Sequence, residues 1–125
     1  FQIASLAQKN GTHHYHLVSS PGADKTSGNA YLQMKGELED KIKTLDFASR
    51  SFYRPSLLVG DRPDFRLGEK VGIVAASVLP YVPGLKKYRA IKGHDVAKKM
   101  VFEAMKIKRG TRTFELDELF SLETN

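Results

Sequence analysis

The sequence predicts an α/β fold built around a parallel β-sheet. Short apolar runs bounded by turn residues alternate along the 125-residue chain with longer segments of helical periodicity. Strands that are separated by helices pair in parallel through right-handed crossovers. The chain holds too few strands for a complete doubly wound sheet. We therefore expect residues 1–125 to be the C-terminal part of one domain, with the N-terminal half missing from this chain.

The opening segment, FQIASLAQKNG, reads as the middle of a longer sequence and begins with Phe1 instead of methionine, which leads us to expect a fragment. Ile3 and Leu6 at helical spacing predict the end of an amphipathic helix, which an Asn-Gly pair terminates. Residues 15–18 then form a short apolar run bounded by turn residues, and this run predicts a strand.

A second helix is predicted over residues 30–45, after a Pro-Gly turn. Ser27 or Asn29 can serve as its N-cap. The apolar stripe of this helix consists of Met34, Leu38, Ile42 and Leu45. The side expected to face water carries Glu37, Glu39, Lys41 and Lys43.

The rest of the chain predicts further alternation of strands and helices. Pro55 removes a donor from the ladder and so marks the end or the edge of a strand. The expected elements are a strand at 51–54 with an apolar continuation at 57–59, a helix at 70–78, a helix at 96–106 with Asp95 as N-cap, a strand at 111–116 and a short tail at 118–122.

Composition excludes several classes of protein. The chain is 41% apolar and 27% charged, as in ordinary soluble domains, and no apolar run approaches the roughly 18 residues of a membrane-spanning helix. It has no cysteine, which excludes disulfides, thiol catalysis and thiolate metal sites. This composition fits a reducing compartment, and we expect a cytoplasmic protein.

The net charge of +6 and the pI near 9.6 raise the question of an acidic partner. The basic residues lie mainly in the C-terminal half, where they alternate with apolar and acidic positions, and no nucleic-acid motif accompanies them. A solvated face explains them most simply, with a pocket for an anionic cofactor or substrate as the alternative. We expect neither nucleic acid nor a membrane as a partner.

Four polar residues near the second predicted helix suggest chemistry. Tyr31 and Lys35 are four residues apart, so a helix places both side chains on one face. Ser19 and Ser20 follow the predicted strand, at the edge where open α/β sheets keep their ligand crevice. An ammonium beside a phenol favours the phenolate, and a serine hydroxyl can position a carbonyl or alcohol oxygen. The spacing of tyrosine and lysine occurs by chance in many helices, so the context carries the interpretation.

Three ordered blocks carry a resemblance to a known family: VSSPGADK at 18–25, YLQMKGELE at 31–39 and YRPSLLVGDR at 53–62. They resemble the short-chain dehydrogenase/reductase superfamily, and in particular its atypical branch with the Tat-interacting oxidoreductase-like proteins and nucleoside-diphosphate-sugar epimerase-like relatives. The similarity covers roughly residues 3–66. The resemblance implies a Rossmann-like, doubly wound parallel sheet and an NAD(P)-dependent oxidoreductase.

The resemblance also assigns roles to individual residues. It makes Tyr31 the catalytic acid/base, with Lys35 holding the nicotinamide ribose and lowering the tyrosine pKa. Ser19 or Ser20 would contact the substrate oxygen, with Ser19 slightly favoured. For the cofactor, it implies that Leu58 lines the nicotinamide and that Arg66 lies near the dinucleotide, although an exposed loop arginine is the alternative for Arg66.

The sequence departs from the family in one respect. Members bind the adenosine and pyrophosphate at a Gly-rich turn before a helix, and this sequence has no such motif. The isolated chain is therefore expected to bind a dinucleotide poorly. The cofactor is expected to be NADP or NAD, with NADP slightly favoured, and the substrate a small carbonyl or alcohol. A homo-oligomer is the alternative to a missing N-terminal half.

Two groups of histidines have simpler interpretations than catalysis. Strand alternation sends His14 and His16 to one face and His13 to the other, and no carboxylate lies nearby in sequence, so we expect no metal site. His94 and Asp95 could form an acid/base pair, but helix capping by Asp95 is the simpler expectation.

Two functions from other classes remain open. A dinucleotide-binding regulator that acts through protein partners without turnover would carry the same motifs. A basic nucleic-acid-binding module is the third and weakest hypothesis, and it predicts binding that falls steeply with salt.

Overall fold

The computed structural model describes residues 1–56, 58–59, 89–106 and 108–122, and these form an α/β structure. Three parallel strands make the main sheet in the order β1-β2-β5. They are β1 (His14–Val18), β2 (Ser49–Arg54) and β5 (Gly110–Glu115). The short strands β3 (Leu58–Val59) and β4 (Ile91–Lys92) form a separate parallel pair. The predicted α/β class and parallel pairing are confirmed.

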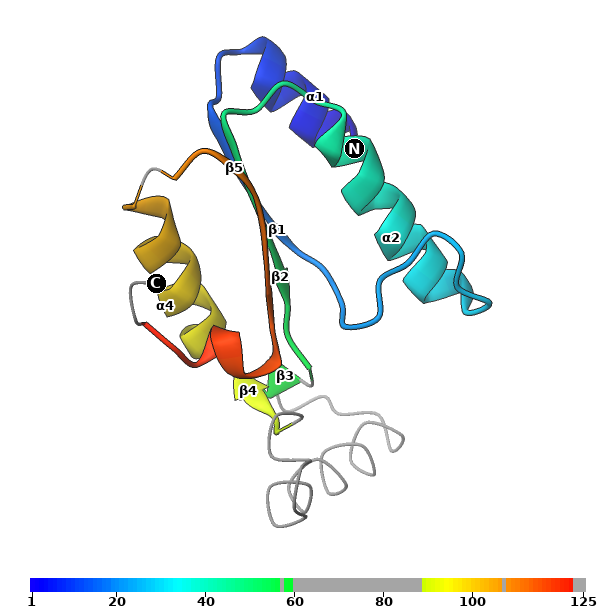
Figure 1. Ribbon diagram of the computed structural model, residues 1–125, viewed down its shortest axis with the longest axis vertical. Helices are drawn as coiled ribbons and strands as arrows, with labels where there is room; N and C mark the ends of the chain where they lie inside the picture. Colours follow the sequence, from blue (N-terminus) through cyan, green and yellow to red (C-terminus); the bar gives the residue numbers. More distant parts are fainter. Residues whose placement is uncertain (57, 60–88, 107, 123–125) are drawn as a thin grey trace.

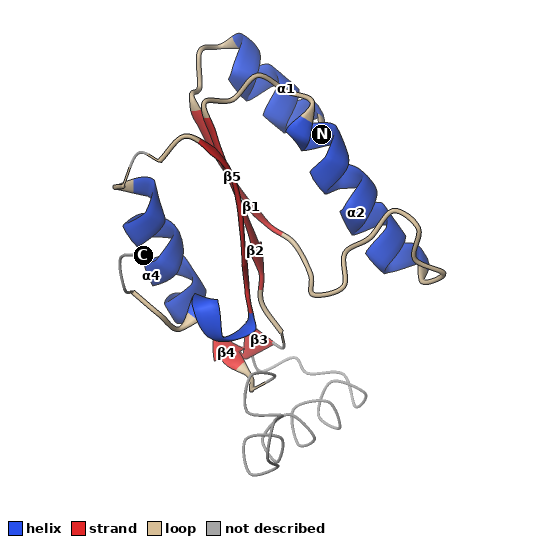
Figure 2. Cartoon of the chain, viewed as in Figure 1, coloured by secondary structure: helices blue, strands red, loops and turns tan. Residues whose placement is uncertain are grey.

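Helices cover both faces of the three-stranded sheet (Figures 1 and 2). On one side lie α1 (Gln2–Lys9) and α2 (Ala30–Lys43). On the other lie α4 (Gly93–Ala104) and the short 3₁₀ helix η3 (Leu116–Leu119). The described residues are therefore arranged in three layers, helix, sheet and helix.

Each face of the sheet has its own apolar core, because alternate residues of a strand point to opposite sides. Under α1 and α2, Phe52 packs with Ala4, Ile42 and Phe47. Under α4 and η3, the buried cluster is Tyr53, Ile91, Val96 and Leu119. Burying an aromatic or branched side chain contributes about 1.5–3 kcal/mol, so the two clusters hold the helices on the sheet.

The second helix follows its prediction closely. The side chain of Asn29 accepts hydrogen bonds from the backbone N–H groups of Tyr31 and Leu32, so Asn29, not Ser27, is the N-cap. Ile42 of the predicted apolar stripe is buried, but Met34 is 53% exposed. Met34 lies on the first half of the helix, away from the cluster under α1 and α2.

Two predictions about the helices are wrong. Glu39 was expected to face water, yet it is 1% exposed, because an arginine from the sheet neutralises it. Asp95 was expected to cap the helix of the C-terminal half, but α4 begins at Gly93 with Lys92 as its N-cap. Asp95 lies instead in the first turn, where a carboxylate is favoured by the helix dipole.

The predicted helix at 70–78 lies outside the described residues. Along the ranges that the structure describes, no helix is both long and apolar enough to cross a membrane.

Candidate functional site

The paired serines lie directly after β1, at its C-terminal end. The backbone N–H of Ser19 donates to the carbonyl of Tyr53 over 2.7 Å, which continues the ladder between β1 and β2 by one residue. The Ser19 hydroxyl is buried and has no hydrogen-bond partner among the described residues. Ser20 is half-buried, and its hydroxyl approaches the carbonyl of Pro21 at 3.5 Å. A buried hydroxyl without a partner is costly, and of the two serines this holds for Ser19.

The loop between β1 and α2 brings the serines toward the helix. Gly22 turns the chain with a φ of +73°, a conformation that a residue without a side chain adopts freely. The Asp24 carboxylate then accepts from the backbone N–H and the hydroxyl of Thr26, both over 2.7 Å. These bonds lower the pKa of Asp24, with the backbone bond contributing most. The loop therefore has a defined turn although it is exposed.

Gly36 lets the loop lie directly against α2. A Cβ atom at this position would stand 2.3 Å from both the carbonyl carbon of Asp24 and the backbone nitrogen of Lys25. The backbone N–H of Asp24 also donates to the carbonyl of Leu32 over 3.2 Å. The glycine in the second sequence block thus sets how close the serine-bearing loop comes to the helix.

Tyr31 and Lys35 lie on the first half of α2 and share one face, as predicted. The ammonium of Lys35 is 5.6 Å from the centre of the Tyr31 ring. Tyr31 is 54% exposed, so its phenol is accessible to a ligand from solvent. The geometry brings the pair together, whereas the catalytic roles of both residues remain predictions.

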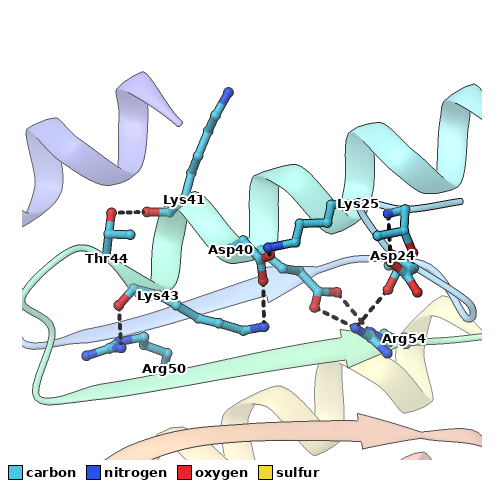
Figure 3. A network of polar contacts seen from close by, with 11 residues as sticks. Asp24, Lys25, Asp40, Lys41, Lys43, Thr44, Arg50 and Arg54 are labelled. Carbon is cyan, nitrogen blue, oxygen red and sulfur yellow. Dashed lines mark hydrogen bonds and ion pairs between the residues drawn. The ribbon is translucent and has the colours of Figure 1, made fainter.

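An ion-pair network centred on Arg54 joins the serine-bearing loop, α2 and the sheet (Figure 3). Arg54, the last residue of β2, donates to both carboxylate oxygens of Glu39 on α2, over 2.9 and 2.6 Å. It also donates to Glu115 at the end of β5 and, over 3.2 Å, to the carbonyl of Ala23 in the loop. The pKa of Arg54 is raised, mainly by its hydrogen bonds to Glu39, so the guanidinium stays charged.

Sequence reasoning missed Arg54, Glu39 and Gly36 as parts of this region. A signal for Glu39 was present, because it lies four residues after Lys35 and therefore continues the stripe that begins at Tyr31. No local signal indicated that Arg54, fifteen residues away, would neutralise it.

Of the two further residues expected near the cofactor, Leu58 and Arg66, the structure describes only Leu58. Leu58 lies on β3 and is 47% exposed, in the segment that follows the end of β2. Arg66 falls outside the described residues, so its position stays a prediction.

The opposite face of the sheet carries a second polar group. His16 Nδ1 shares a 2.9 Å hydrogen bond with the Tyr53 hydroxyl, and the two rings stack at 5.8 Å between centroids. Burial, followed by the charge of Arg112, lowers the pKa of His16, and burial raises the pKa of Tyr53 to about 12. Both groups are therefore neutral at pH 7.

The remaining histidines do not form a site with carboxylates in the part of the chain that the structure describes, where no group of three potential metal ligands occurs. His94 Nδ1 lies 3.7 Å from the Asp95 carboxylate at the exposed start of α4. The pair is remote in sequence from the serines and from Tyr31, and nothing in its geometry favours acid/base chemistry.

No family model matches the sequence. Among curated proteins, the chain is 48% identical over 66 residues to protein HTATIP2 of Rattus norvegicus, covering 53% of this chain and 27% of the relative. It is 37% identical over 110 residues to the mitochondrial protein fmp52 of Aspergillus clavatus, covering 87% of this chain and 47% of the relative. For the mitochondrial FMP52 of Candida glabrata the identity is 45% over 67 residues, or 54% of this chain and 29% of the relative.

The chain is a partial homologue of the HTATIP2 and FMP52 proteins. This confirms the resemblance to the atypical branch of the short-chain dehydrogenase/reductase superfamily, a family of NAD(P)-binding, oxidoreductase-like proteins. The chain spans half or less of the length of these relatives. The FMP52 relatives carry the word mitochondrial in their names, whereas the cytoplasmic location expected for this chain stays a prediction.

Proposed function

We propose that this chain carries the proton-transfer residues of an NAD(P)-dependent oxidoreductase of the short-chain dehydrogenase type. The observation that carries the proposal is the placement of the Lys35 ammonium beside the Tyr31 ring, on the helix that follows the buried, unpartnered hydroxyl of Ser19. Homology with the HTATIP2 and FMP52 proteins supplies the class of cofactor.

The residues present fit one half of the cofactor. Tyr31 and Lys35 offer a phenol and an ammonium at an accessible helix face, a donor set suited to ribose hydroxyls and to a carbonyl oxygen. A Gly-rich turn for the pyrophosphate is absent from this sequence. When bound, the nicotinamide would supply or accept the hydride. Leu58 would line its ring, and Arg66 would contribute a positive charge near the dinucleotide.

In this proposal each residue has one task. The Ser19 hydroxyl donates to the substrate oxygen and replaces the partner it lacks. Tyr31 transfers a proton to that oxygen during reduction and takes it back during oxidation. Lys35 holds the ribose hydroxyls through its ammonium. Ser20 is the second candidate for the contact with oxygen.

We also propose that the chain is the C-terminal part of one NAD(P)-binding domain with a Rossmann-like sheet. Among the described strands β1 pairs on one edge only, with β2. Ile3 and Leu6 of α1 are 79% and 63% exposed. Apolar side chains on a helix face that is covered by another element would be much less exposed. A further strand and helix would cover both features. Homo-oligomerisation is the alternative, and the mass of the purified protein in solution distinguishes the two.

Replacement of Tyr31 tests the proposed function directly. In the protein purified at its natural length, Tyr31→Phe should lower the turnover of small carbonyl substrates with NADPH or NADH by at least about 100-fold, the usual worth of a positioned acid/base group. Tyr15→Phe is the matched control, because Tyr15 is half-buried against the core and stacks on Phe47 at 5.0 Å between centroids.

The outcome separates the enzyme from the regulator. Turnover that is lost in Tyr31→Phe and kept in Tyr15→Phe supports the oxidoreductase. If the wild-type protein binds dinucleotide without turnover and Tyr31→Phe leaves its binding of protein partners intact, the proposed chemistry is wrong and the non-catalytic regulator replaces it.

A further inference from the structure

Arg54 connects three separate parts of the candidate site. It stands at the last position of β2, where the parallel strands end and the serines follow β1. Its guanidinium donates to Glu39 on α2, to Glu115 on β5 and to the carbonyl of Ala23 in the serine-bearing loop. The helix, the sheet and the loop therefore meet at one side chain, which is only 19% exposed.

The contact with Glu39 fixes the helix along its length and in rotation. Tyr31, Lys35 and Glu39 are spaced four residues apart, so they form one stripe along α2. The Glu39 side chain is 2% exposed and is held through both of its oxygens. A planar guanidinium that bonds two carboxylate oxygens restricts orientation as well as distance. Rotation or sliding of α2 would break these bonds.

The contact with Ala23 fixes the loop against the same helix. The Arg54 guanidinium donates to the Ala23 carbonyl over 3.2 Å, one residue before the stretch that lies on Gly36. Lys25 adds an ion pair to Asp40 of α2 at 3.2 Å, but both side chains are well exposed, so solvent weakens it. Arg54 is thus the buried tie between the loop that carries Ser19 and the helix that carries Tyr31.

We propose that Arg54, acting through Glu39 and the Ala23 carbonyl, is a positioning residue that sets the distance between the Ser19 hydroxyl and the Tyr31–Lys35 pair. This inference rests on the proposed function. Arg54 touches neither substrate nor cofactor in this role. It keeps the hydroxyl of Ser19 and the phenol of Tyr31 within reach of the same oxygen. Small displacements of such groups lower the reaction rate strongly.

The chain offers a matched control in Arg50. This arginine lies four residues earlier on β2, points to the same face and also reaches α2 (Figure 3). It donates to the carbonyls of Lys43 and Phe47 over 2.8 and 3.0 Å, at the end of α2 remote from Tyr31. Arg50→Lys and Arg54→Lys therefore make the same chemical change on the same strand at opposite ends of the helix.

The test compares these variants in the protein at its natural length, by steady-state kinetics with NADPH or NADH. Arg54→Lys keeps the charge but lacks the planar fork that bonds both Glu39 oxygens, so kcat should fall about 10-fold or more while KM for the dinucleotide changes far less. Arg50→Lys should leave kcat unchanged, whatever it does to melting temperature.

A double-variant comparison separates positioning from general stability. In a Tyr31→Phe background, Arg54→Lys should cause little further loss of kcat, because the group it positions is gone. Glu39→Gln serves as a second variant if Arg54→Lys does not fold, since it keeps the shape of the side chain and one accepting oxygen, and the same fall in kcat with little change in KM for the dinucleotide is expected.

The inference is overturned if Arg54→Lys and Glu39→Gln lower only the melting temperature, as Arg50→Lys can, or if Arg54→Lys costs as much in the Tyr31→Phe background as alone. Those results would leave the proposed function standing, provided that Tyr31→Phe itself lowers turnover as expected. Full activity in Tyr31→Phe would instead remove the proposed function and this inference with it.

Discussion

At the scale of single residues, the candidate site depends on two contacts: the approach of the Lys35 ammonium to the Tyr31 ring and the ion pair of Arg54 with Glu39. The spacing of Tyr31 and Lys35 was enough to predict that they share a helix face, and their 5.6 Å approach confirms it. The burial of Glu39 could not be predicted from its neighbours, because a carboxylate on a helix normally faces water. Its partner Arg54 comes from the sheet, so only the tertiary structure brings the two charges together. Breaking such a pair costs about 3–5 kcal/mol.

Gly36 supplies the prediction at this scale. Gly36→Ala should destabilise the protein by about 1–3 kcal/mol, because the new Cβ must displace the backbone of Asp24 and Lys25. Turnover should fall with it, since the loop carries the serines. Gly28→Ala is the control: a Cβ there meets nothing within 4 Å. Equal melting temperatures for the two variants, measured by thermal denaturation, would show that the loop does not rest on α2.

At the scale of elements, the sequence predicted the segments with clear periodicity and missed those set by contacts. The observed α2 and the three strands of the main sheet lie within about two residues of their predicted bounds. The predicted start of α4 is too late. Asp95 is the better capping residue by type, but the observed N-cap is Lys92, the last residue of β4. The predicted strand at 15–18 placed the two serines at the end of β1. The general position of ligand sites in open sheets then made them candidate site residues.

The sheet face under α4 makes the protein sensitive to mild acid. His16 of β1 faces Tyr53 of β2 and Arg112 of β5, with Glu103 of α4 and neighbouring His14 also within electrostatic reach. Because burial lowers the pKa of His16, the unfolded chain takes up this proton first as the pH falls. The free energy of unfolding should therefore keep its full value above the ordinary histidine pKa of about 6.5. It should decrease as the pH drops through that value.

Denaturant unfolding at a series of pH values between about 7.5 and 5 measures this effect. His16→Gln should flatten the slope of stability against pH over this interval, because the titrating group is removed. His13→Gln, at an exposed position, should leave the slope as in the wild type. Carboxyl groups such as Glu103 contribute at lower pH: burial alone would raise its pKa, but hydrogen bonds from Lys99 and Lys106 outweigh burial and lower it. A slope unaffected by His16→Gln would refute the assignment.

For the whole molecule, we propose that the chain provides one side of a dinucleotide site. The described strands form a parallel sheet with helices on both faces, and the matched stretches span half or less of the relatives' length. Fold class and family could be predicted from the sequence because blocks of local sequence carry them. Substrate identity could not, since loops far apart in the sequence shape a substrate pocket. The proposed cofactor stays NADP or NAD, because the acidic or basic residue that discriminates between them in such folds cannot be identified in this sequence.

The most direct measurement is a calorimetric titration of NADPH and NADH onto the protein at its natural length, with Lys35→Ala and Lys41→Ala as a matched pair of variants on α2. The account predicts saturable binding of one dinucleotide per chain. Lys35→Ala should weaken it by about 10-fold or more, the worth of a charge-assisted hydrogen bond, whereas Lys41→Ala, on an exposed face of the same helix, should bind like the wild type. Absence of binding by the wild type, or equal affinity in Lys35→Ala, would contradict the central claim that this helix face holds the nicotinamide ribose.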